Sequence, residues 1–109
     1  MSNIINKNQS FFVENNTRFV FIDGDANDVI EKCYATLKVQ LSIPDYFGNN
    51  LDALEEVMND LDWIEEEKIN IIISGENNLL KNDLESKNDF LEILETSSLE
   101  KISIVYLIK

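Results

Sequence analysis

The chain of 109 residues contains no histidine and only one cysteine, Cys33. Without histidine there is no imidazole to act as a general base or a metal ligand, and one cysteine cannot form an internal disulfide. Carboxylates alone can serve acid–base or magnesium chemistry, but their spacing here marks no such site. We therefore expect no enzyme activity, no catalytic residues, no bound metal and no cofactor.

Basic residues are also scarce, with nine Lys and Arg against 21 Asp and Glu and a formal net charge of −12. A field of this sign repels nucleic acid and anionic membrane surfaces and attracts basic proteins. No apolar stretch has the length of a membrane span, and the N-terminus lacks the pattern of a signal peptide. The sequence thus predicts a cytoplasmic protein, monomeric when free, with a basic protein as partner and no binding to nucleic acid or membrane.

Proline occurs once, at Pro44, and one of only three glycines follows closely at Gly48. Proline ends a preceding helix because it lacks an N–H and favours extended geometry in the residue before it. Gly48 permits a turn that most residues resist, and Asn50 is suited to be the N-cap of a helix that starts at Leu51. The stretch predicts a tight loop between two helices.

The rest of the chain alternates between strand and helix patterns. Aromatic and β-branched residues predict strands at 18–22, 68–73 and 102–108, and the almost continuous apolar run of the second suggests burial on both faces. Apolar residues at helical spacing predict three helices, with the stripes Ile30, Cys33, Leu37, Leu41; Leu51, Leu54, Val57, Met58, Leu61; and Phe90, Leu91, Leu94. This order predicts an α/β fold with a small parallel sheet of three strands. Residues 11–13 are expected to add a strand through a hairpin.

Two helix starts are assigned from polar residues. Asp25 or Asn27 is expected to cap the first helix, and Asn88-Asp89 the last. Asp23, Asp25 and Asn27 also resemble the opening of a calcium-binding loop, but the pattern then fails because Asp28 stands where glycine is needed. A strand-to-helix turn is the preferred interpretation of residues 23–28. Cys33 lies on an apolar stripe and is expected to be a core residue rather than a nucleophile.

The second helix is acidic on one side. Its acids share a face because they lie three and four residues apart: Asp52, Glu55, Glu56 and Asp60. Such a face is either an ordinary solvated surface or a binding surface for a basic partner. The aromatic pair Tyr46-Phe47 beside it favours the binding surface, since it adds an apolar anchor, although Phe47 is also suited to the core.

The stretch from Pro44 to Leu54 resembles the barstar family, small intracellular inhibitors of barnase-type ribonucleases. Family members carry the pattern Pro-acid-Tyr-Tyr-Gly-x-Asn-Leu-Asp-Ala-Leu after their first helix, and this chain follows it with one conservative change, Phe47 for Tyr. The resemblance extends over about residues 18–108. It implies three parallel strands with helices packed on them, in a domain of residues 18–109 preceded by an extension of residues 1–17.

The resemblance also implies an inhibitor that blocks the active site of a basic nuclease. Tyr46 would lie over that site, Asn50 and Asp52 would bind at its rim, and Glu56 would occupy the phosphate subsite. The expected partner-binding set is Tyr46, Asn49, Asn50, Asp52, Glu55 and Glu56.

The chain departs from the family at several positions. Glu55 replaces a tryptophan, Glu56 is longer than the family's Asp, and Trp63 comes two residues later than a family tryptophan. The family's acid on the last helix matches either Glu95 or Thr96. These differences leave the target open, and an acidic interaction module that kept the fold without inhibiting a nuclease is the alternative.

Overall fold

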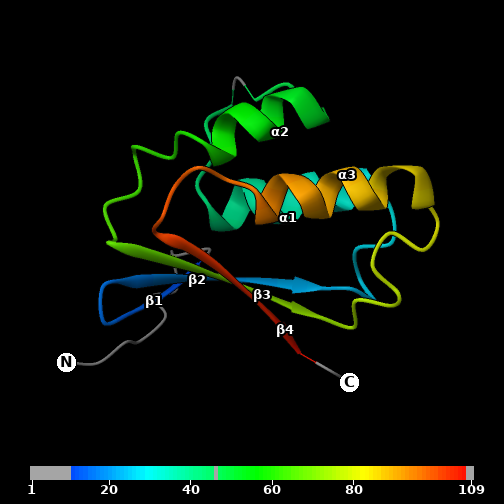
Figure 1. Ribbon diagram of the computed structural model, residues 1–109, viewed down its shortest axis with the longest axis horizontal. Helices are drawn as coiled ribbons and strands as arrows, with labels where there is room; N and C mark the ends of the chain where they lie inside the picture. The colour runs from blue at the N-terminus through cyan, green and yellow to red at the C-terminus, as the bar shows by residue number, and fades with distance from the viewer. Residues whose placement is uncertain (1–10, 46, 108–109) are drawn as a thin grey trace.

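The computed structural model describes residues 11–45 and 47–107. Its elements are β1 (Phe12–Glu14), β2 (Thr17–Asp23), α1 (Ile30–Gln40), α2 (Leu51–Met58), β3 (Lys68–Ser74), α3 (Leu84–Glu95) and β4 (Ile102–Leu107). They form one sheet in the order β1-β2-β3-β4, in which β2, β3 and β4 are parallel and β1 is antiparallel to β2. The predicted α/β fold is confirmed, including the added N-terminal strand (Figure 1).

The added strand is held by a two-residue turn. Phe12 lies opposite Phe19 and Glu14 opposite Thr17, and the turn residues Asn15 and Asn16 have φ of 54° and 59°. Asparagine tolerates this left-handed geometry, which the turn of a tight hairpin requires. The rings of Phe12 and Phe19 are 5.5 Å apart, centroid to centroid. The predicted hairpin is therefore confirmed.

All three helices cover the same face of the sheet, which leaves the other face open (Figure 1). On β3, Ile69, Ile71 and Ile73 point toward the helices and are fully buried, whereas Ile72 is only partly buried. Phe21, which pairs with Ile72 in the sheet, is 48% exposed. The prediction that β3 is buried on both faces is wrong, because none of the helices in the described residues packs on the far side.

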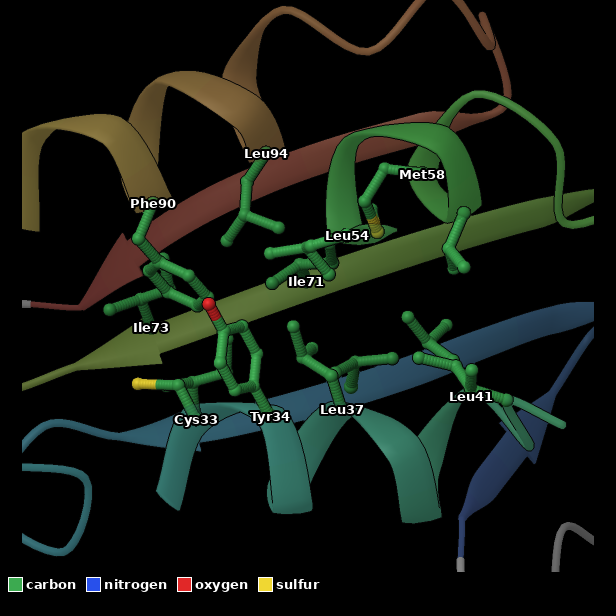
Figure 2. Close-up of a cluster of buried hydrophobic side chains, with 14 of the residues drawn as sticks. Cys33, Tyr34, Leu37, Leu41, Leu54, Met58, Ile71, Ile73, Phe90 and Leu94 are labelled. Carbon is green, nitrogen blue, oxygen red and sulfur yellow. The ribbon is translucent and has the colours of Figure 1, made fainter. Parts of the chain in front are cut away.

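The core lies between the helices and the sheet. Figure 2 shows side chains from α1, α2 and α3 meeting over β3: Cys33, Tyr34, Leu37, Leu41, Leu54, Met58, Ile71, Ile73, Phe90 and Leu94. Cys33 is fully buried among them, as predicted, and burial raises the pKa of its thiol to about 12. The loss of Leu37 or Leu54 would leave a cavity that costs about 2–5 kcal/mol.

Both predicted helix starts are wrong, because the carboxylate of Asp83, and neither of the predicted caps, lies at the N-terminal ends of α1 and α3. The N-cap position of α1 is Val29, which has no side-chain acceptor, and the N–H of Ile30 donates instead to Oδ2 of Asp83, 3.2 Å away. Asp83 directly precedes α3, and its Oδ1 accepts a hydrogen bond from the Ser86 hydroxyl at 3.1 Å. One carboxylate thus lies at the N-terminal ends of two helices, where negative charge is favourable. Asn27, by contrast, donates to the Asp23 carbonyl and accepts from Thr36.

Candidate functional site

The loop between α1 and α2 is anchored from within. Ile43 and Phe47 are 5% and 7% exposed, and the Phe47 ring meets the Tyr34 ring edge-on with centroids 5.7 Å apart. Phe47 is therefore a core residue and offers no anchor to a partner. Tyr46, the other half of the aromatic pair and a predicted contact residue, lies outside the described residues.

Two asparagines join this loop to α2. Asn49 is exposed and takes φ of 52°. Asn50 caps the helix as predicted, because its Oδ1 accepts the N–H of Ala53 at 2.8 Å, and its Nδ2 donates to the Gly48 carbonyl at 3.3 Å. The loop therefore enters α2 in a defined conformation.

The exposed side of α2 is acidic, as the spacing predicted. Asp52, Glu55 and Glu56 face solvent, while Leu54 and Met58 on the other side are fully buried. None of the ion pairs among the residues described involves these three acids. The helix ends at Met58, so Asp60 lies beyond it in a turn and is not part of the helical face.

A shallow hollow of about 440 Å³ separates the start of α2 from α1. It brings three predicted residues together, Asn49, Asn50 and Asp52, and is completed by Ile30, Glu31, Tyr34 and Leu51. Glu55 and Glu56 lie outside this hollow. Its lining combines amide, carboxylate and hydroxyl groups with apolar surface.

A second groove, of about 270 Å³, runs between α2 and α3. Asp52 and Glu55 line one side, Asp89 and Glu92 line the other, and Leu51 and Ile93 supply its apolar surface. Sequence reasoning missed Asp89 and Glu92. Their spacing of three residues would have placed them on one helix face, but the helix start at Asn88-Asp89 put the first of them in a cap.

The acid expected on the last helix does not face this groove. A carboxylate oxygen of Glu95 accepts a short hydrogen bond from the Tyr106 hydroxyl of β4. Burial, and then this carboxylate, raise the pKa of Tyr106 above its ordinary value. The Thr96 hydroxyl donates to the backbone carbonyl of Glu92 at 2.7 Å. Both candidate positions are thus engaged within the fold, and Asp89 and Glu92 are the α3 acids that face α2.

The turn that resembles a calcium loop is held by its own hydrogen bonds. Oδ1 of Asp23 accepts the N–H of Asp25, and Oδ1 of Asp25 accepts from the Asn78 amide at 2.7 Å. Within residues 11–45 and 47–107, no three metal-binding side chains come together. In the same part of the chain, no helix has the length and apolar character needed to span a membrane.

Comparison with protein families identifies a match over most of the chain. The model of the family described as "Barstar (barnase inhibitor)" matches residues 17–105, which include the loop, α2 and both grooves. No curated protein matches the chain. The matched family consists of proteins that bind barnase-type ribonucleases and are inhibitors rather than enzymes. The chain belongs to the barstar family.

Proposed function

We propose that this protein inhibits a basic, barnase-type ribonuclease or a related nuclease toxin by covering its active site with residues 43–50 and α2. The observation that carries the proposal is a row of exposed acids on α2 that lack an ion-pair partner in the described chain and follow a loop anchored by buried side chains. Family membership supports the same partner class. The inhibitor would act in the cytoplasm as a monomer and protect the cell that makes the toxin.

The acids of α2 would take the place of RNA phosphates. A ribonuclease binds phosphate with Arg and Lys, and carboxylates satisfy the same donors through charge-assisted hydrogen bonds. Asp52 is positioned at the first turn, next to Asn50, and Glu56 lies one helical turn farther on. We assign Glu56 to the phosphate subsite and Asp52 to the rim. The net charge of −12 would accelerate encounter with a basic enzyme in a salt-dependent way.

The loop would dock without reorganising. Ile43 and Phe47 hold it to the core, and the Asn50 cap fixes where α2 begins. A segment ordered before binding loses less conformational entropy on association. The exposed side chains of Asn49 and Asn50 would then meet the nuclease from a rigid base.

The groove between α2 and α3 would extend the interface. A long basic side chain could lay its methylene groups on Leu51 and Ile93 and place its charge among the four surrounding carboxylates. Asp89 and Glu92 are therefore added to the proposed contact set. Arginine fits this groove better than lysine, because its planar head can bind two carboxylates at once.

Calorimetric titration against barnase tests the proposal with three proteins: the wild type, Asp52→Ala/Glu56→Ala and the control Glu65→Ala/Glu67→Ala. Both double variants lose two negative charges, but Glu65 and Glu67 are exposed residues of the connector between α2 and β3. Hydrogen bonds to charged groups contribute roughly 1.5–3 kcal/mol each, so two lost contacts should weaken binding about 10²- to 10⁴-fold.

The control should bind within a few-fold of the wild type. Equal weakening in both variants would show that net charge alone matters. A partner captured from the source cell that binds the site variant as well as the wild type would instead support the alternative, an acidic interaction module without nuclease inhibition.

A further inference from the structure

Phe11 precedes residues 17–105, which match the family, yet its ring contacts a buried charge within them, that of Arg18. The ring of Phe11 lies against the guanidinium of Arg18, with 3.8 Å between Cζ and the ring centroid. Arg18 is on β2, points to the helix side of the sheet and is only 6% exposed. A cation in this position needs partners, because burial of an unpaired charge is costly.

The partners of Arg18 lie in the connector before β3 and just at and after the end of α1. Its Nε donates to Oε1 of Glu66 at 2.8 Å, and its Nη1 donates to the Ser42 hydroxyl at 3.3 Å and the Gln40 carbonyl at 3.4 Å. Ser42 is the residue at which the chain leaves α1 and turns into residues 43–50. The buried side chain of Arg18 therefore connects Phe11, which precedes β1, to the start of the proposed nuclease-binding loop.

Residues 40–42, the corner where the chain leaves α1, are held by further interactions. Ser42 has φ of 54°, a left-handed conformation that is uncommon for residues other than glycine, asparagine and aspartate. The Trp63 indole donates to the Leu41 carbonyl at 2.9 Å. The Gln40 amide forms two hydrogen bonds with the backbone of Phe21, at 2.7 and 2.9 Å, beyond the residues of β2 that pair with β1.

We propose that Phe11 and Arg18 are positioning residues for the nuclease-binding loop. The Phe11 ring shields the guanidinium from water and keeps it directed at Ser42 and Gln40, which fixes the corner from which the loop departs. The Phe11 side chain thereby acts as a brace for the binding surface. The effect of Phe11 and Arg18 on the conformation of the loop is independent of the proposed function. Their effect on the affinity for a nuclease rests on that function.

Hydrogen exchange of the loop amides tests the brace without any partner. The N–H of Ile43 donates to the Lys38 carbonyl and that of Phe47 to the Pro44 carbonyl. Phe11→Ala should speed their exchange by at least two- to fivefold, since cation–π contacts contribute about 0.5–1 kcal/mol even at exposed sites and Arg18 is buried. Phe11→Tyr keeps the ring and should restore the wild-type rates.

Phe12→Ala is the matched control. Phe12 is the next residue and begins β1, but its ring packs on Phe19, on the face of the sheet opposite Arg18. Global stability, measured by urea unfolding, normalises the exchange rates of both variants. Faster exchange at Ile43 and Phe47 in Phe11→Ala alone supports the proposal, and equal rates in the two variants overturn it.

Dissociation from barnase then tests the consequence. Phe11→Ala should dissociate two- to fivefold faster than the wild type, and Phe12→Ala at the wild-type rate. If the wild type binds barnase and Phe11→Ala dissociates no faster, the brace does not serve binding, although the inhibitor function stands. If the wild type does not bind, the proposed target fails while the exchange result still decides whether Phe11 positions the loop.

Discussion

The cap of α2 gives a quantitative prediction. Asn50→Ala removes the acceptor for the Ala53 N–H, a bond of 2.8 Å at the first turn of an eight-residue helix. Loss of such a cap costs about 1 kcal/mol, within a range of about 0.5–2. With an unfolding entropy of roughly 2.1 cal/mol/K per residue over the 109 residues, this cost corresponds to a fall of about 4 °C in melting temperature.

Scanning calorimetry measures this fall, and Asn50→Ser provides its control. Serine keeps an acceptor suited to the N-cap but, like alanine, lacks the amide that donates to the Gly48 carbonyl. The serine variant should therefore recover most of the 4 °C estimated from the cap energy. The reasoning would be refuted if Asn50→Ala melted at the wild-type temperature, or if the serine variant lost as much as the alanine variant.

Three further predictions concern Asn49, Gly24 and Cys33. Asn49→Gly keeps the left-handed turn and should leave the melting temperature unchanged, while titration with barnase shows whether the side chain contributes to binding. Gly24→Ala would place a Cβ 2.0 Å from the Gly75 carbonyl oxygen and push the ends of β2 and β3 apart, so the urea midpoint should report a loss of about 2–3 kcal/mol. Cys33 should resist a thiol reagent at pH 8 until the protein unfolds, because burial raises the pKa of its thiol to about 12. The contribution of Cys33 to the free energy of unfolding, measured against Cys33→Ala, should accordingly be constant below the unfolded thiol pKa of about 8.5 and fall as the pH rises above it. Rapid labelling of the native protein, or no such fall relative to Cys33→Ala, would contradict the assignment.

Local signals in the sequence were sufficient for the hairpin of β1 and β2 and for the start of α2. Asn50 accepts the N–H of Ala53, three residues away, and the pairing of β1 with β2 depends on two asparagines at the turn itself. These interactions lie within a few residues of one another, so composition and spacing reveal them.

The features that sequence reasoning missed depend on residues far apart in the chain. The N-terminus of α1 is bound by Asp83, 53 residues away, and no local pattern marks that contact. The buried pairing of Arg18 with Glu66 crosses 48 residues. The open face of β3 follows from all three helices packing on one side, which its apolar run cannot indicate.

The candidate site also has a part that the sequence predicted and a part that only the packing of the helices shows. The acids of α2 were identified from their spacing, whereas Asp89 and Glu92 join them only through the packing of α3 against α2. Phe47 was placed correctly only once its contact with Tyr34 was known. The contact roles of Asn49, Asn50, Asp52, Glu55 and Glu56 stay predictions, as does the boundary between the extension of residues 1–17 and the domain of residues 18–109.

Inhibition of a purified barnase-type ribonuclease is the most direct test of the central claim. RNA cleavage is followed while the protein is added in increasing amounts at low salt. We expect cleavage to fall to zero at one inhibitor per enzyme, and Asp52→Ala/Glu56→Ala to leave the enzyme active at that ratio. Full cleavage at a large excess of the wild-type protein would contradict barnase-type inhibition, and full inhibition by the double variant would place the binding surface elsewhere.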